Sequence, residues 1–410
     1  FVNEMINENI IVSTEIMPLD KAKKLAITYE NDSLLLLIRR TELKYLSALD
    51  FKTISEKQLV NKQMKINEVL KYARTLNQHT QLYDILKHRL INKGYIRSDK
   101  QKEDLNDLVL SELHLIANNS YQGFEAQKLH LLFQATYYLN SGNYKSAIRY
   151  YQELINLFND NQHLILNPPI YYLSAIQGIL DSLCIAGLYH ETPFFLSKLE
   201  ELTQNEYSTE FILHLKTLIY IYKSNSLLQA GNFEQALELR DKQENELLKK
   251  VTSLGLESQL RLYLSFAVLG MYTKDYVQAR KYMKKIFSLG KLFCAFPSYK
   301  IARLVNLLLQ AELGNYDFFE NEIISIKRNI RFEKQTYITE KLIFKFIQGY
   351  PLPSYEKARN KRWLQYQKDI QKIEQDKYER QLLKTFDVLA WIESKLTQRS
   401  LADILAEKAH

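Results

Sequence analysis

Glycine and proline are scarce in this sequence. There are only 11 glycines and 7 prolines among 410 residues, whereas these two residues together make up about 12% of an average protein. Sheet-rich proteins need many tight turns, and tight turns depend on these residues. The scarcity therefore argues against a sheet-rich fold and predicts an all-α protein with long helices joined by short loops.

Cysteine is nearly absent as well, because Cys184 and Cys294 are the only two. Two cysteines cannot build a disulfide framework or a cysteine-rich metal site. Both lie in apolar helical sequence, so we expect both side chains to be buried, in a reducing, cytoplasmic compartment. The chain begins at Phe1 rather than Met, so we expect it to be a piece of a longer protein. Both a removed signal peptide and an upstream domain are compatible with this start.

Long apolar runs and catalytic motifs are also missing. A run such as Leu34–Ile38 is far shorter than the ~18 residues that span a bilayer, so we expect no membrane span. There is no G-x-S-x-G elbow and no glycine-rich loop before Lys-Ser or Lys-Thr. No two of the eight histidines are four residues apart, so no helical zinc pair forms. We therefore expect a protein that is not an enzyme and has no cofactor and no metal.

A short motif recurs along the chain. It joins a turn residue, Asn or Asp, an aromatic residue and, three positions later, alanine. The clearest copies are Gly142–Ala147, Gly231–Ala236 and Lys274–Ala279, with a degenerate copy at Gly314–Phe319. The aromatic markers fall at positions 51, 95, 144, 189, 233, 276, 316 and 355, with spacings of 39 to 49 residues. Such a regular spacing indicates a repeated structural unit.

The motif describes the turn of a helical hairpin. Glycine ends one helix in the left-handed conformation, and Asn or Asp caps the next helix. The aromatic side chain is expected to pack between the two helices. After the first copy, apolar residues recur at helical spacing, as in Ala147, Tyr151 and Leu154. Hairpins of this kind become stable by stacking on one another.

These residues resemble the tetratricopeptide-repeat (TPR) family. The best match is residues 131–157, where Ala135, Tyr138, Gly142 and Tyr144 occupy the family's small, aromatic and turn positions. The second copy matches at Ser224, Phe233 and Ala236 and departs at Arg240, where an aromatic residue is usual. The family repeat has 34 residues, so the helices or connections here must be longer. The resemblance implies a right-handed α-solenoid of about seven or eight hairpins with helical caps.

The same pattern predicts three parts of the chain. Residues 1–40 form an N-terminal helical cap, with Asp20 as a candidate N-cap. Residues 41–336 form the TPR-like array. Residues 337–410 contain the last hairpin, a basic tract and a C-terminal capping helix expected at Leu382–Leu396.

The family resemblance also implies a concave surface lined by the first helix of each hairpin. In the family's register, its polar positions are Thr136, Asn140, Gln177, Asp181, Asn225, Gln229 and Arg261. Asn and Gln side chains both donate and accept hydrogen bonds, so a row of them suits an extended peptide backbone. The alternative is that these residues are ordinary solvated positions. Some positions in the same register are apolar, namely Leu132, Leu228 and Leu264. Either they form the apolar floor of the groove, or the register is shifted by one residue.

Positive charge is concentrated near the C-terminus. Residues 327–384 contain 15 Lys or Arg and 7 Asp or Glu, an excess equal to the +8 of the whole chain. A candidate basic patch comprises Arg359, Lys361, Arg362, Trp363, Tyr366 and Lys368. Such a patch is a solvated helix face, a contact for nucleic-acid phosphates with stacking aromatic rings, or a contact for an acidic protein.

The sequence therefore predicts a non-catalytic scaffold that binds a protein or peptide segment in its concave groove. Two alternatives are a peptide-responsive sensor domain of a larger protein and nucleic-acid binding through the basic tract. The oligomeric state is not readable from the sequence.

Overall fold

The computed structural model describes residues 16–94, 96–117, 123–290, 293–294, 296–332 and 338–409. In these residues every regular element is helical and none is a strand, which confirms the prediction of an all-α protein. None of the described helices has the length and apolar character needed to cross a membrane.

The chain divides into two compact units. Unit 1 consists of Phe1–Leu86, Leu105–Phe133 and Glu153–Leu166, and unit 2 of Lys87–Asp104, Gln134–Gln152 and Asn167–His410. The predicted limit between residues 40 and 41 does not separate two elements, because it falls inside one helix, Asp32–Ala48. The predicted limit between residues 336 and 337 lies outside the described residues.

Unit 1 is built from helices that hold one another through ion pairs and a small apolar core. These helices are α2 (Ile16–Thr28), α3 (Asp32–Ala48), α6 (Asn106–Ala117) and parts of α4 (Glu56–Lys93), α7 (Phe124–Asn140) and α8 (Tyr144–Asp160). Glu42 of α3 forms ion pairs with Lys23 of α2 and Lys62 of α4. Asn31, not Asp20, caps α3, and Asp20 lies within α2. The expected N-cap at Asp20 is therefore wrong, because α2 begins four residues earlier.

A buried carboxylate joins three helices of unit 1. Glu112 of α6 is 1% exposed, and its Oε1 lies 2.6 Å from Nδ1 of His130 on α7. Its Oε2 lies 3.6 Å from Nδ1 of the buried His79 on α4. Burial alone raises a carboxyl pKa, but the hydrogen bonds and charges of His130 and His79 outweigh it and lower the pKa of Glu112.

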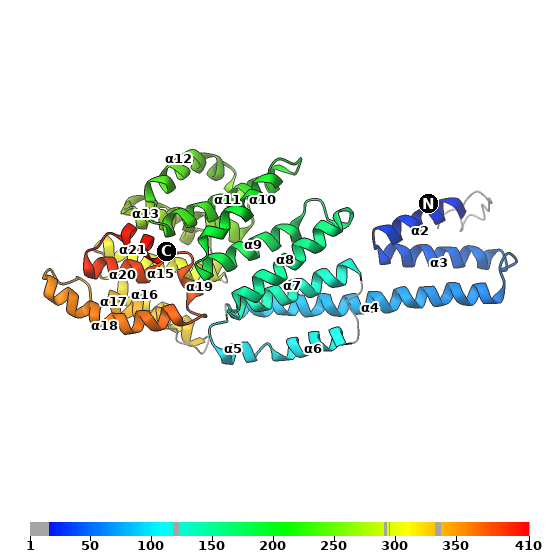
Figure 1. Cartoon of the computed structure of the whole chain (residues 1–410), viewed down its shortest axis with the longest axis horizontal. Coiled ribbons are helices and arrows are strands. Elements are labelled where there is room, and N and C mark those ends of the chain that lie inside the picture. The colour runs from blue at the N-terminus through cyan, green and yellow to red at the C-terminus, as the bar shows by residue number, and fades with distance from the viewer. Residues whose placement is uncertain are drawn as a thin grey trace. The chain divides into compact units, whose positions relative to one another are not determined.

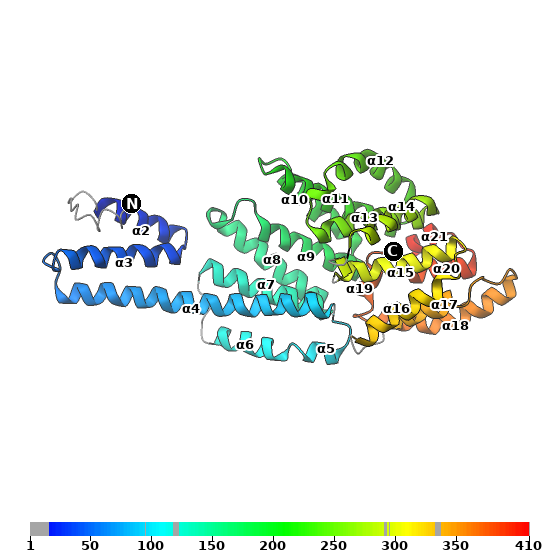
Figure 2. The same ribbon diagram turned by 180° about the vertical axis from the view of Figure 1, so that it is seen from behind.

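In unit 2, successive helices follow a recurring contact scheme. Helix α11 contacts α9, α10, α12 and α13, and α13 in turn contacts α12, α14 and α15. Helix α15 then contacts α16 and α17, and both views show these helices side by side (Figures 1 and 2). The bounds are α9 (Ile170–Ala186), α10 (Thr192–Leu202), α11 (Thr209–Gln229), α12 (Phe233–Lys249), α13 (Leu256–Tyr272), α14 (Tyr276–Ser288), α15 (Pro297–Glu312), α16 (Phe318–Phe332) and α17 (Ile338–Ile347).

Four of the eight aromatic markers of the repeat stand at the start of a helix, whereas Phe51 and Tyr316 lie in turns. Tyr144, Phe233 and Tyr276 are the first residues of α8, α12 and α14, and Tyr189 begins a short 3₁₀ helix before α10. Glycine takes the left-handed conformation before three of these starts, at positions 142, 187 and 231. The marker at Tyr95 lies outside the described residues. Tyr355 is 82% exposed. Contrary to the expectation for an aromatic marker, it therefore does not pack between two helices.

One glycine sets how closely two helices of unit 2 approach. A Cβ atom built on Gly178 of α9 would lie 2.2 Å from the ring of Tyr151 on α8. Real Cβ atoms do not come this close to other atoms, so only glycine fits without movement of the ring. Tyr151 is 5% exposed, which leaves its ring little room to move.

The C-terminal part of unit 2 returns to its earlier helices. Helix α18 (Glu356–Gln375) is followed by α19 (Arg380–Leu383), α20 (Val388–Thr397) and α21 (Leu401–Ala409). Helix α20 packs on α18, whereas α19 contacts α9 and α21 contacts α11. The expected single helix Leu382–Leu396 is therefore wrong. It is broken because Asp387 caps α20 by accepting a hydrogen bond from the backbone N–H of Ala390.

A buried ion cluster fixes another part of this return. Arg97 donates hydrogen bonds to Glu340 of α17 and to Glu379, which precedes α19. All three side chains are less than 10% exposed. Glu379 also accepts hydrogen bonds from the backbone and hydroxyl of Thr339. The cluster therefore ties the segment before α5 (Asp99–Glu103) to both α17 and the chain before α19.

We predict that Gly178→Ala destabilises the protein. Alanine favours helix over glycine by about 1 kcal/mol, but overpacking against Tyr151 costs about 1–3 kcal/mol, so a net loss of stability is expected in urea unfolding. The double variant Gly178→Ala, Tyr151→Leu tests the mechanism. If the alanine is equally harmful when the ring is absent, the close approach is not the cause.

We also predict that Glu112→Gln destabilises unit 1 at pH 7. The amide keeps the shape of the side chain but loses a charged hydrogen bond, which contributes about 1.5–3 kcal/mol. Hydrogen exchange should become faster in α6 and stay unchanged in α13. An unchanged exchange rate in α6 would contradict a stabilising role for the carboxylate. The exposed Glu191, 3.8 Å from His190, supplies the matched control Glu191→Gln, for which we expect no effect.

Candidate functional site

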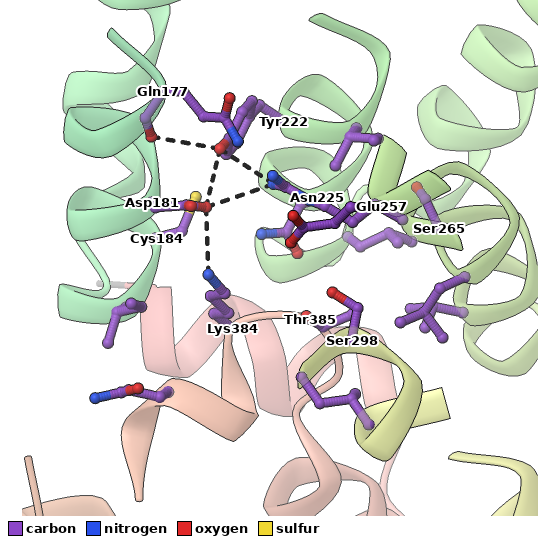
Figure 3. A pocket seen from close by; sticks show the side chains of 18 of the residues that line it. Gln177, Asp181, Cys184, Tyr222, Asn225, Glu257, Ser265, Ser298, Lys384 and Thr385 are labelled. Carbon is purple, nitrogen blue, oxygen red and sulfur yellow. Dashed lines mark hydrogen bonds and ion pairs between the residues drawn. The ribbon is translucent and has the colours of Figure 1, made fainter. Parts of the chain in front are cut away.

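Unit 2 contains a pocket enclosed by several helices, here called the polar pocket. Its walls come from α9, α11 and α13, with contributions from the end of α7, the start of α15 and the segment Gln381–Thr385 (Figure 3). Its cavity volume is about 220 Å³, which is smaller than the ~300–1,000 Å³ of typical drug-sized ligand sites.

Helical periodicity explains why these side chains face one cavity. Gln177 and Asp181 lie four residues apart on α9, and Glu257, Arg261 and Ser265 repeat the same spacing on α13. Residues four apart share one face of a helix. On α13, 12 of 17 residues are buried, so these three form a polar stripe on a mostly apolar helix. The sequence of α13 therefore leaves one polar face, and that face lines the pocket.

A charged cluster forms one wall of the polar pocket. The Asp181 carboxylate lies 3.3 Å from Nζ of Lys384 and 3.5 Å from a guanidinium nitrogen of Arg261. The Tyr222 hydroxyl donates a hydrogen bond of 2.9 Å to Asp181 and accepts one of 3.1 Å from Arg261 (Figure 3). The Arg261 guanidinium also lies 5.5 Å from the centre of the Tyr222 ring. The cluster therefore joins α9, α11, α13 and the C-terminal segment.

The charges of this cluster fix its protonation states. Burial disfavours the ionised form of Asp181, but Lys384 and Arg261 outweigh this effect and lower the pKa of its carboxyl. Burial raises the pKa of the neighbouring Cys184 thiol to about 12. At neutral pH the carboxylate is therefore ionised and paired, and the thiol is protonated. Because the thiolate is the nucleophilic form of cysteine, the protonated Cys184 thiol is not activated for attack.

The structure brings five of the seven predicted groove residues together. Asn140, Gln177, Asp181, Asn225 and Arg261 all line the polar pocket. Of the apolar positions in the same register, Leu228 and Leu264 line it as well, whereas Leu132 is buried elsewhere.

Two predicted groove residues lie outside the pocket lining. Thr136 is one turn before Asn140, and its carbonyl accepts a hydrogen bond from the Asn140 side chain. Gln229 lines a neighbouring cavity with Asp387 and Lys408. Each of the two residues shares a helix face with a pocket residue but lies one turn, about 5.4 Å, farther along the helix axis, and so lies beyond the pocket lining.

Sequence reasoning missed three polar residues that shape the pocket. Tyr222 is three residues before Asn225 on the same face of α11, so the helical period offered a signal for it. Lys384 is about two hundred residues from Asp181 in sequence, and no local pattern relates them. Gln381, which donates hydrogen bonds to the carbonyls of Asn140 and Ile96, was missed for the same reason.

The candidate basic patch is not exposed as a whole. Arg359 is 8% exposed and donates hydrogen bonds to the carbonyls of Pro353 and Ser354. Arg362 donates to the carbonyl of Gly349, and Trp363 packs against the core. Tyr366 is 6% exposed. These four side chains fall on the face of α18 that packs against the fold, with Arg359 and Tyr366 buried and Arg362 and Trp363 partly buried.

Two members of the candidate patch are exposed to solvent, and Arg362 and Trp363 are partly exposed. Lys361 and Lys368 are exposed, seven residues apart on the outer face of α18. With Tyr366 buried, this patch has no tyrosine ring on which a nucleic-acid base can stack.

The two cysteines differ in their exposure to solvent. Cys184 is buried as expected, whereas Cys294 is exposed, so the expectation of burial is wrong for Cys294. Within the residues that the structure describes, no group of three or more His, Cys, Asp or Glu side chains is arranged to hold a metal ion.

Comparison with models of protein families, with curated proteins and with solved structures found no match. The resemblance to the TPR family therefore remains a prediction from the sequence.

We predict that Asp181→Asn destabilises the protein by about 3 kcal/mol at pH 7, because it leaves the buried charges of Arg261 and Lys384 without their partner. The native state holds the pKa of Asp181 below its ordinary value of 3.8. Its stabilising contribution is therefore present above that pH and is lost as the pH falls through the lowered pKa. Urea unfolding at several pH values should show the gap between wild type and variant narrowing in acid.

The exposed pair of Asp369 and Lys345, 3.8 Å apart, provides the control. Asp369→Asn should change the free energy of unfolding by less than about 1 kcal/mol. Equal effects of the two substitutions would contradict a special role of the Asp181 cluster.

Proposed function

We propose that unit 2 belongs to a TPR-like stack of helical hairpins and binds a peptide or protein segment in the polar pocket without catalysing a reaction. The observation that carries this proposal is the convergence of five residues, chosen from the repeat register alone, on one cavity. The recurring contacts of α9, α11, α13 and α15 support the stacked arrangement, because a stack requires each hairpin to touch the next.

The chemistry of the pocket suits an extended backbone. The amides of Gln177 and Asn225 can each donate and accept hydrogen bonds, as peptide N–H and C=O groups require. Leu228 and Leu264 supply an apolar floor beside them. Because the volume is about 220 Å³, the pocket suits a short stretch with one or two side chains rather than a folded domain.

The charges of the pocket favour recognition by hydrogen bonds over attraction of a highly charged ligand. Asp181 and Glu257 are balanced by Arg261 and Lys384 within the same lining. A ligand with a large net charge would gain little from such a balanced wall. A neutral or zwitterionic peptide segment is therefore the best match.

Selection from a random peptide library tests this function. Peptides enriched on the wild-type chain should be synthesised and their affinity measured by isothermal titration calorimetry. We expect the double variant Gln177→Ala, Asn225→Ala to bind these peptides with an affinity reduced by up to about tenfold. This is the effect of losing hydrogen bonds that contribute about 1–1.5 kcal/mol in total.

The control variant is Lys361→Ala, Lys368→Ala on the exposed face of α18, which should bind as wild type does. Circular dichroism should show that both variants remain folded. If no peptide is enriched, or if the enriched peptides bind the pocket variant with unchanged affinity, the proposal is wrong.

A further inference from the structure

Unit 2 contains a second cavity whose lining is strongly basic, here called the basic cavity. Its volume is about 440 Å³. Four cationic side chains line it: Lys102 of α5, Lys145 of α8, Lys377 before α19, and Arg380 of α19. No Asp or Glu is among its lining residues. Unlike the polar pocket, this cavity therefore has cations without matching carboxylates in its wall.

The nearby acidic groups only partly offset these cations. Asp99 lies 4.0 Å from Nζ of Lys377, with its side chain 80% exposed to water. Arg380 donates a hydrogen bond to the backbone carbonyl of Glu374, which does not neutralise its charge. The charges that act on Tyr144 of the lining include the Asp376 carboxylate as well as Arg380. Lys102 and Lys145 form no ion pair within the described part of the chain. A positive potential therefore remains in the cavity.

Backbone donors add to the positive wall. The turn of Ser141, Gly142 and Asn143 and the first residues of α8 line the same cavity. The first N–H groups of an α-helix have no acceptor within the helix, and the positive end of the helix dipole favours an anion there. Asn143 Oδ1 already accepts from the N–H of Ser146, so the N–H groups of Tyr144 and Lys145 are the ones left for a ligand.

The remaining wall is apolar and aromatic. It is formed by Tyr138, Ile148, Ala186 and Leu188. Inorganic phosphate alone would leave this surface wet, whereas a ligand that carries both an anion and an apolar group would cover it.

We propose that the basic cavity binds a small organic phosphate monoester. The dianionic phosphate would lie between the four cations and the start of α8, and the organic group against the apolar wall. Phosphate fits better than a carboxylate because it carries a larger charge and more acceptor oxygens. This site is separate from the polar pocket and goes beyond the proposed peptide binding.

Calorimetric titration at low salt tests the proposal with three probes: inorganic phosphate, adenosine monophosphate and adenosine. We expect inorganic phosphate to bind, adenosine monophosphate to bind more tightly, and adenosine not to bind. Binding should weaken as salt is added, because the contacts are electrostatic. If neither phosphate compound binds at millimolar concentration, or if adenosine binds as well as its monophosphate, the proposal is overturned.

Lys145→Glu is the decisive variant. An acidic residue in the first turn of a helix is favourable, so the fold should be kept, while the charge that meets the phosphate is reversed. We expect a loss of affinity of at least about tenfold for both phosphate compounds. Lys361→Glu makes the same charge change on the exposed face of α18 and should leave affinity unchanged. Equal loss in both variants, or no loss in Lys145→Glu, would show an adventitious ion only.

Discussion

Unit 2 depends on one constraint: α13 is apolar around most of its circumference, so neighbouring helices must cover it on almost every side. Helices α11, α12, α14 and α15 supply that cover. The polar stripe of Glu257, Arg261 and Ser265 is then the face that these helices leave open. The polar pocket follows from this arrangement, because a stripe of charged and hydroxyl side chains cannot be buried against an apolar neighbour without a large penalty.

The parts of the fold that could be predicted from the sequence are those encoded within one repeat. The structure begins a helix at Tyr144, Phe233 and Tyr276, as the turn motif predicts. Asn143 and Asp275 cap two of these helices through their side chains, whereas Asn232 makes no such cap hydrogen bond before Phe233. The groove residues follow from the same local period. Asn140, Gln177 and Asn225 reach one cavity because helical spacing fixes the face on which each of them lies.

The parts that could not be predicted depend on contacts between distant segments. The return of the C-terminal chain to earlier parts of unit 2 rests on pairs such as Lys384 with Asp181 of α9 and Glu379 with Arg97, which precedes α5. No periodicity relates such partners. Composition also misled the interpretation of the basic tract, because a count of charges cannot separate Lys361, which faces water, from Arg359, which is used inside the fold.

The same C-terminal segment gives the two cavities of unit 2 opposite electrostatic characters. In the polar pocket, Lys384 meets Asp181, so the chain supplies its own counter-charge and leaves mainly hydrogen-bonding groups for a ligand. A few residues earlier, Lys377 and Arg380 add two cations to a wall that already holds Lys102 and Lys145. Hydrogen-bonded recognition depends little on ionic strength, whereas a wall of uncompensated cations attracts anions in a salt-sensitive way. One short segment thus gives the two cavities different charge balances, since Lys384 is paired with Asp181 of α9, whereas Lys377 and Arg380 add to the cations beside α8.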